Sequence, residues 1–486
     1  MAETVAKPAA WGSAPDRQNA PHAWWILAVI LTVAAMDILD GTIVNVAIPS
    51  IREDLGTGSA GLQWIVGGYA LTFAIGLIAG GRLGDIYGRK RMFQVGVASF
   101  TIMSVACGLA PSTGVLILFR LLQGFAAAMM IPQGFGLIRE SFSQEDLPKA
   151  LSFWGPSSAI GALMGPVIGG LIIDLDAFGT GWRGVFLVNL PVGIAALAAG
   201  TKLIPNPRGK HEDAPGLDYS GAAILGIAVG LLFFPLIEGR EQGWPWWIFA
   251  MFAASLATFI FFVRFERARE RDGKSQIILL SIFNRSSFLS GSMLISLLFM
   301  GMAGLLLVTT LYLQVDQHYS AIHAGLTFIP LSIGTAVGAI GAGVFLLPRT
   351  GRHTLHLGTV IALIGMVALI LVLDADGHDI TSWDLAPAML VFGTGLGLLI
   401  APAYSFALSG VGFRELGSGS GVLNSMQQLG TAIGVAGIGT IFFSVTDDHG
   451  MLVAIERSFV VIAALVVVVA ALIFALPMER DKEPGS

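Results

Sequence analysis

The sequence is poor in charged residues and almost free of cysteine. Asp, Glu, Lys and Arg make up only 12% of the 486 residues, whereas hydrophobic residues make up 55%. Soluble domains carry about 25% charged residues, so a soluble globular protein is excluded and an integral membrane protein is indicated. The single cysteine, Cys107, excludes an intrachain disulfide, and the eight histidines lie mostly at the ends of apolar stretches. We therefore expect no metal site and no redox cofactor.

Fourteen apolar stretches are long enough to cross a bilayer, for which a helix needs about 20 residues. They lie near residues 24–46, 62–81, 92–110, 113–135, 149–172, 184–204, 219–236, 246–263, 288–313, 324–347, 354–373, 385–408, 418–443 and 459–477. The first twenty residues lack the apolar core and the small-residue cleavage site of a signal peptide, so we expect a soluble tail there. The sequence therefore predicts an all-α integral membrane protein with 14 transmembrane helices.

Lys and Arg are concentrated in alternate connections between these stretches. If the N-terminus is cytoplasmic, the outer connections contain only Arg52, Arg183, Arg240 and Arg457. Because cytoplasmic loops carry the excess of Lys and Arg, the pattern predicts that both termini lie in the cytoplasm. An even number of helices agrees with that placement.

Two polar interruptions, 205–218 and 264–287, bracket the seventh and eighth stretches. The predicted parts are a tail at 1–23, a six-helix bundle at 24–204, a linker with two inserted helices at 205–287, a six-helix bundle at 288–477 and a tail at 478–486. Transporters are often built from two repeated halves with the substrate site at their interface. The basic run 264–272 fits a solvated helix end near anionic lipid, so no nucleic-acid partner is expected.

Two carboxyl groups, Asp37 and Asp40, lie inside the first apolar stretch. An acid at mid-bilayer costs roughly 2.5–3.5 kcal/mol on insertion scales, so such residues usually face a protein interior or an aqueous cavity. Their spacing of three residues places both on one side of a helix. We interpret them as groups that bind a proton or a cationic substrate. The alternative is that one of them only anchors a polar contact between helices.

Arg120 is the one basic residue inside a predicted span, in the fourth stretch. Counted from the outer ends of their helices, Arg120 and Asp40 lie at similar depths. An arginine beside a carboxylate favours the charged form, and burial without a partner favours the protonated form. Switching between these two states would make Asp40 a proton carrier. The pair could instead be a static link between two helices, and Asp37 could pair with Arg120.

Five segments resemble the motifs of a known transporter family. Residues 81–90 (Gly-Arg-Leu-Gly-Asp-Ile-Tyr-Gly-Arg-Lys) resemble the loop signature of the major facilitator superfamily. Residues 39–49, 120–124 and 161–170 are similar to the first-, fourth- and fifth-helix motifs of its fourteen-helix drug:proton antiporter branch, and residues 182–191 resemble the segment that follows in that branch. With the span count and order, the resemblance covers nearly the whole chain.

The resemblance implies a major facilitator fold, no enzymatic activity and a monomer in the plasma membrane. It also implies a conformational gate formed by Gly81, Asp85, Gly88 and Arg89, although these charges could instead only set topology. In the fifth helix it implies an antiporter motif and outward transport, although a glycine-rich membrane helix often serves close packing only. The motif residues are Gly161, Gly165, Pro166, Gly169 and Gly170.

The second half contains no acid or base well inside its ninth to thirteenth spans, so its candidates are uncharged. Residues 424–430 resemble a family motif in which Gln427 stands where Arg is usual, which removes a possible second charge. Across both halves, the predicted substrate-binding residues are Asp37, Asp40, Asn45, Tyr69, Gln123, Tyr312, Tyr404, Asn424, Gln427 and Gln428.

We therefore predict an antiporter that exports amphipathic small molecules, including lipophilic cations, by alternating access. Its partners would be the substrate, protons and membrane lipids, with the proton gradient in place of a cofactor. The alternatives are a dedicated exporter of one metabolite or antibiotic and a membrane receptor or scaffold that transports nothing. A membrane enzyme is disfavoured because the spans hold no nucleophile–base constellation.

Overall fold

The computed structural model describes residues 19–176, 179–205, 218–274, 276–278, 280–409, 411 and 416–474, and every regular element in this part of the chain is helical. The long helices of the first half and of the insert are α1 (Ala23–Leu55), α2 (Ser59–Tyr87), α3 (Arg89–Gly108), α4 (Thr113–Ser141), α6 (Trp154–Leu175), α8 (Asn189–Leu203), α9 (Tyr219–Glu241) and α10 (Trp246–Arg271). Those of the second half are α11 (Ser286–Leu311), α13 (Ile329–Gly341), α15 (His353–Asp376), α16 (Ser382–Ser409), α17 (Leu416–His449) and α18 (Met451–Ile473).

Shorter helical turns complete several of the predicted spans. These are α5 (Leu147–Ser152), η2 (Gly181–Arg183), α7 (Gly184–Leu187), η3 (Leu280–Asn284), η4 (Tyr312–Asp316), α12 (Ala321–Thr327), η5 (Ala342–Leu346), α14 (Leu347–Thr350) and η6 (Gly377–Asp379). Both η4 and η5 are π-helical turns, which insert one residue into a helix and occur often at functional sites.

Each predicted stretch corresponds to helix, which confirms the all-α class. Within the described residues, 12 helical segments are long and apolar enough to cross a membrane. The other two predicted stretches correspond to α3, which begins with three basic residues, and to α6, of which only Met164–Leu175 counts as a short apolar helix. The count of fourteen spans therefore stays a prediction. The expected tail at 478–486 and most of that at 1–23 lie outside the described residues.

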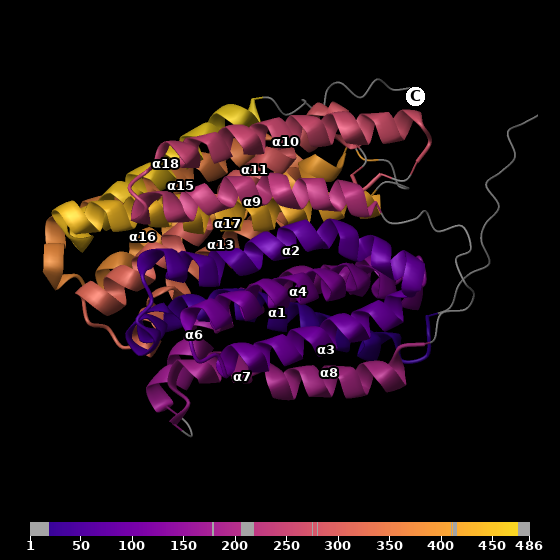
Figure 1. The fold of residues 1–486 in the computed structure, drawn as a ribbon, viewed down its shortest axis with the longest axis horizontal. Coiled ribbons are helices and arrows are strands. Elements are labelled where there is room, and N and C mark those ends of the chain that lie inside the picture. Colours follow the sequence, from indigo (N-terminus) through magenta and orange to yellow (C-terminus); the bar gives the residue numbers. More distant parts are fainter. Residues whose placement is uncertain are drawn as a thin grey trace, which may run out of the picture.

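The helices form two bundles that meet along two seams (Figure 1). In the first bundle α2 and α3 pack on α4, while α6 and α8 pack on α1. In the second, α13 and α15 pack on α16, while α17 and α18 pack on α11. One seam joins α2 to α17 and the other joins α6 to α12; we call them the α2–α17 seam and the α6–α12 seam.

The inserted hairpin, α9 and α10, covers the α2–α17 seam (Figure 1). Helix α9 contacts both α2 and α17, whereas α10 packs mainly on α9. Phe233 of α9 is 1% exposed, and it enters a groove beside Gly67 of α2 and Ala432 of α17. A Cβ atom at Gly67 would lie 2.7 Å from the Phe233 ring, so the missing side chain is what admits the ring.

Polar contacts at one end of α9 tie it to both bundles. Glu238 accepts a hydrogen bond from the Trp64 indole of α2 at 2.9 Å. Arg240 donates to Ser59 Oγ at 2.6 Å and pairs with Asp447 of α17. We call the Ser59–Arg240–Asp447 contacts the α9 strap, because they join the first half to the second through the insert.

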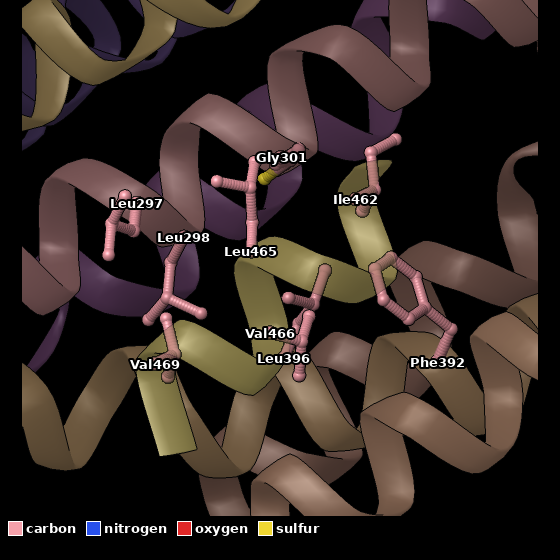
Figure 2. A pocket seen from close by; sticks show the side chains of 10 residues that line it. Leu297, Leu298, Gly301, Phe392, Leu396, Ile462, Leu465, Val466 and Val469 are labelled. Carbon is pink, nitrogen blue, oxygen red and sulfur yellow. The ribbon is translucent and has the colours of Figure 1, made fainter. Parts of the chain in front are cut away.

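The second bundle is closely packed around α11, α16 and α18. Figure 2 shows a small gap there, lined by apolar side chains such as Leu298, Phe392 and Val466. Its volume is about 10 Å³. A gap of that size with an apolar lining offers a water molecule few hydrogen-bond partners, so we interpret it as a packing defect and not as a binding site.

Candidate functional site

Asp40 and Arg120 meet in the interior of the first bundle. Arg120 Nη1 lies 2.6 Å from Asp40 Oδ2, and the side chains are 1% and 0% exposed, respectively. Gln123 Nε2 and Asn189 Nδ2 donate to the other carboxylate oxygen, Oδ1, at 2.9 and 2.7 Å. The depth argument from sequence thus places the right two helices together. A buried carboxylate is costly unless it is paired and hydrogen-bonded, and here α4 and α8 supply both.

Arg120 makes further contacts in this arrangement. Its Nε donates to the carbonyl oxygen of Ile65 at 3.1 Å, and its Nη1 also donates to Gln123 Oε1 at 2.9 Å. The guanidinium carbon lies 4.2 Å from the centre of the Tyr69 ring, within the range of a cation–π contact. Buried ion pairs are tolerated when further hydrogen bonds satisfy their polar atoms, and the bonds from Nε and Nη1 of Arg120 serve in this way.

Asp37 contacts the hydroxyl group of the same tyrosine, Tyr69, whose ring faces Arg120. The Tyr69 hydroxyl donates to Asp37 Oδ1 at 2.5 Å, and Asp37 is 7% exposed. Asp37 therefore contacts Tyr69, and the direct Asp37–Arg120 pairing considered from sequence is not the arrangement seen. The four side chains Asp37, Tyr69, Arg120 and Asp40 form one chain of contacts, which we call the buried relay.

Asn189 is a member of this site to which sequence reasoning gave no role. It is the first residue of α8 and also donates to Ser104 Oγ of α3 at 2.9 Å. Ser104 in turn donates to the carbonyl oxygen of Phe186 at 2.9 Å. The available signal was an amide side chain inside an apolar stretch, in a segment already noted for its resemblance. Its partner could not be identified without the packing of α8 against α1.

The proposed gate lies at the junction of α2 and α3. Asp85 belongs to the last turn of α2, whereas Arg89 is the first residue of α3, so the pair bridges the end of one helix and the start of the next. Their side chains are 3.0 Å apart. Gly88, with φ of +90°, makes the break between the helices, whereas a Cβ atom at Gly81 would make only an ordinary contact with Pro132 at 3.9 Å.

A third charge joins this junction. Arg89 Nε lies 3.3 Å from Glu140 Oε1, at the end of α4. Both carboxylates are more than 40% exposed, so each ion pair is weak on its own. Sequence spacing did not predict the contact with Glu140, because Glu140 is distant from Arg89 in the chain.

The glycines of the fifth-helix motif bring α6 against helices of both bundles. A Cβ atom at Gly161 would lie 2.9 Å from the Ala35 carbonyl, and one at Gly165 would lie 1.9 Å from Thr42 Oγ1, both on α1. Gly169 likewise faces Ile43 of α1. On the opposite bundle, Gly170 faces the backbone of α12, and the Pro166 carbonyl lies beside Gly325 of α12. The motif therefore sits in the α6–α12 seam.

The remaining predicted substrate-binding residues are dispersed. Tyr404 of α16 donates a hydrogen bond to Gln427 of α17, where Asn424 and Gln428 are half-buried. Tyr312 is fully buried in the π-helical turn η4, and its hydroxyl donates to the Gly377 carbonyl at 3.1 Å. The structure does not bring Tyr312 together with the relay.

Asn45 lies one turn beyond the relay on α1. Its amide nitrogen donates to the carbonyls of its own helix at 3.3 Å, and its Oδ1 atom is buried with no hydrogen-bond partner in the structure. Gln314 of the second bundle donates to the neighbouring Val46 carbonyl at 3.0 Å, so this part of α1 faces the other half. Within the described residues no group of three or more His, Cys, Asp or Glu side chains could hold a metal ion.

Comparison with known proteins identifies the family. The model of the Major Facilitator Superfamily matches residues 30–218 and 219–435, which together make up most of the sequence. The chain belongs to the major facilitator superfamily. This superfamily member is therefore a multi-pass membrane transport protein for small molecules, and not an enzyme.

Its relatives include antibiotic and multidrug transporters. The chain is 43% identical to the probable actinorhodin transporter of Streptomyces coelicolor, over 90% of this chain and 76% of that protein. It is 35% identical to a puromycin resistance protein of Streptomyces alboniger, over 88% of this chain and 84% of that protein. It is 32% identical to the multidrug resistance protein Stp of Mycobacterium tuberculosis, over 84% of this chain and 73% of that protein. These likenesses confirm the predicted family.

Solved structures of other superfamily members share the fold. A bacterial homologue of the human lysosomal transporter Spinster superposes with a TM-score of 0.67 at 16% identity, over 98% of this chain and 100% of that chain. A peptide transporter of the POT family superposes with a TM-score of 0.66 at 14% identity, over 95% of this chain and 99% of that chain. At such low identity these structures support the fold alone.

Proposed function

We propose that this superfamily member is a proton-coupled antiporter that exports amphipathic drugs or antibiotics, lipophilic cations among them. The observation that carries the proposal is the buried Asp40–Arg120 pair with its amide donors Gln123 and Asn189. The printed names of its relatives, which include antibiotic transporters and resistance proteins, support the cargo class.

The relay explains how a proton could be coupled to movement. With Asp40 charged, the pair holds α1 to α4 by an ion pair and α1 to α8 by a hydrogen bond. A proton on Asp40 cancels that charge, and Arg120 keeps only the neutral acceptors Ile65 and Gln123. The remaining carboxylate of the relay is then Asp37. The energy comes from the proton gradient, and no bound cofactor takes part.

The proposal extends to the setting of the protein. A monomer lies in the plasma membrane with both termini in the cytoplasm, as the distribution of Lys and Arg favours. Two bundles, residues 24–204 and 288–477, rock about the seams where they meet, and the linker 205–287 carries the insert. In this orientation the α2–α3 junction is cytoplasmic and the α9 strap is external.

The test is transport by the Asp40→Asn variant in vesicles. Asn keeps the size of the side chain but carries no titratable group, so export driven by a pH gradient should fall to background. Ethidium, a lipophilic cation, serves as the cargo, and the protein must remain folded by its elution profile. Glu53→Gln, on an exposed position of the same helix, is the matched control and should keep full activity. Undiminished export by Asp40→Asn would overturn the proton assignment.

A dedicated exporter of one antibiotic is the second candidate. The candidate residues of the second half are uncharged. There Gln427, at a position where the family usually has Arg, forms a hydrogen bond with Tyr404. This favours a narrower range of cargo charges. An efflux screen over cationic, neutral and anionic compounds separates the two candidates. Export of a single chemical series would support the dedicated exporter.

A further inference from the structure

A cavity of about 640 Å³ lies between the inserted hairpin and the α2–α17 seam. Its walls come from α2, α9, α10 and α17, and η3 with the residues before it closes one end. Small-molecule sites usually enclose roughly 300–1,000 Å³, so the volume suits a drug-sized ligand. No member of the buried relay lines it, which makes it separate from the site described above.

The lining changes from apolar to polar along its length. Leu225, Val229 and Phe259 supply apolar walls, whereas Arg267, Glu270 and Asn284 supply polar groups at the end closed by η3. Phe259 and Arg267 are eight residues apart on α10, which corresponds to about 12 Å along a helix. The cavity therefore matches a molecule with an apolar body and one polar or charged end. By the proposed orientation, the polar end faces the cytoplasm.

The polar end of the cavity is preformed, because the fully buried Glu266 binds the segment that closes this end. Glu266 Oε2 accepts from the Ile277 backbone N–H at 3.2 Å, and Gln276 Nε2 donates to the Glu266 carbonyl at 3.2 Å. Arg82 of α2 donates to the Gln276 carbonyl at 3.3 Å, which ties this segment to the first bundle. Contacts from both bundle and insert thus preform this end of the cavity.

A second acid fixes the wall formed by α9. Asp218 caps the start of α9 by accepting from the Gly221 N–H at 3.0 Å, and it pairs with Arg269 of α10 at 2.9 Å. A Cβ atom at Gly221 would lie 2.5 Å from Glu266 Oε1 and 2.6 Å from Asp218 Oδ2, so the two carboxyl groups face each other over this glycine. The ends of both inserted helices are therefore locked together beside the cavity.

From this geometry we infer that the cavity is an entry site, where amphipathic cargo from the inner leaflet binds before it reaches the space between the bundles. The inference rests on the proposed function and names the place where cargo is first held. Its inner wall is the face of α17 that carries Ser425, Met426 and Leu429. The polar candidates Asn424, Gln427 and Gln428 are neighbours on the same helix, so cargo that leaves the cavity in this direction has the α2–α17 seam to pass.

The experiment fills the cavity and measures binding of a small probe. The probe is a diazirine-bearing benzyl trialkylammonium ion in proteoliposomes, and cross-linked peptides are mapped. Val229→Trp should reduce labelling of α9, α10 and α17 by about tenfold, equal to 1.4 kcal/mol of binding. The matched control is Ile227→Trp on the same helix, where the native side chain is 57% exposed. Labelling should stay at the parental level in that control.

A second pair of variants guards against a folding defect. Phe259→Ala removes an aromatic wall without adding bulk and should weaken labelling, whereas Ile260→Ala, at an exposed neighbouring position, should not. A diazirine-bearing phosphatidylglycerol is used in parallel to distinguish cargo from lipid. Labelling of the cavity by this lipid alone, or equal ammonium labelling in all four variants, overturns the inference.

The outcome is separable from that of the proposed function. Asp40→Asn should retain probe labelling of the cavity while it loses antiport. Intact antiport in the parent with no labelling of the cavity would remove the entry site and leave the antiporter. Labelling of the cavity without proton-driven export in the parent would remove the antiporter and leave the binding site.

Discussion

Asp40 receives hydrogen bonds from three side chains on two helices, and these donors fix the position of its carboxylate. Arg120 supplies a charge, whereas Gln123 and Asn189 supply neutral N–H groups. Hydrogen bonds to charged groups contribute about 1.5–3 kcal/mol each. The bond from Asn189 is therefore a substantial part of the link between α1 and α8.

Asn189→Ala tests this role. Removal of one donor leaves the Asp40 carboxylate less firmly held, so the initial rate of proton-driven export should fall by about tenfold or more, the equivalent of about 1.5–3 kcal/mol. The rate is measured in vesicles of fixed internal pH. Ser104→Ala is the control, because it breaks the Ser104–Asn189 contact and leaves the bond from Asn189 to Asp40. An unchanged rate in Asn189→Ala would mean that this bond is not part of proton coupling.

Asp37 offers a test of cargo charge. Exchange of a monovalent cation for one proton moves no net charge, whereas exchange of a neutral molecule moves one, worth about 2.3 kcal/mol per 100 mV. If Asp37 binds the cation, Asp37→Asn should weaken export of a lipophilic cation more than export of a neutral compound of similar size. Both are measured under an imposed pH gradient and then an imposed potential.

The control for that experiment is Tyr69→Phe. It removes the hydroxyl that donates to Asp37 and keeps the ring that faces Arg120. Its losses should fall between those of the parent and Asp37→Asn for the cation. Equal losses for both cargoes in Asp37→Asn would show that Asp37 is not a cation site.

At the scale of elements, the α2–α3 junction and the α9 strap lie at opposite ends of the same helix, α2. Arg89 links the end of α2 to the end of α4 within the first bundle, whereas Arg240 links α9 to both bundles. Exposed ion pairs contribute about 0.2–1 kcal/mol each, so neither set locks the protein. Each is suited to shift a balance between two conformations.

Arg89→Ala removes both pairs at the junction and should favour the inward-open state by a few-fold in population, as expected from about 0.2–1 kcal/mol per pair. Distances between spin labels at Gln144 and His353, both exposed and at the proposed cytoplasmic ends of the two bundles, report the change. Cys107 is first replaced by Ser. Arg91→Ala removes one charge from the same turn and serves as the control. Identical distance distributions in both variants would leave the charges a topological role only.

Arg240→Ala should act in the opposite sense. Loss of the α9 strap frees the external end of the α2–α17 seam, so the outward-open population should rise, again by no more than a few-fold because Asp447 is 65% exposed. Spin labels at the exposed positions Ser112 and His449 report the separation of the external ends. A shift to shorter distances would contradict this role of the strap.

At the scale of the whole molecule, apolar runs predicted where the helices lie because a bilayer demands about 20 apolar residues for each crossing. They underestimated α1, which continues to Leu55, since the polar ends of a helix extend beyond the hydrocarbon layer. Similar depths made the Asp40–Arg120 contact a candidate from sequence, although a pair between Asp37 and Arg120 stayed open. The contacts of Asn189 and Glu140 could not be predicted, because their partners depend on which helices pack together.

The fit of Phe233 between Gly67 and Ala432 has a consequence for how such chains change over time. A larger side chain at position 67 would force the α9 ring out, and loss of the hairpin would leave an open groove along the α2–α17 seam. The inserted hairpin, α9 and α10, could be taken for an independent addition to the two bundles. Its Phe233 ring nevertheless fits a groove to which both bundles contribute. In evolutionary terms, the hairpin and its seam should be inherited, exchanged and lost as one unit.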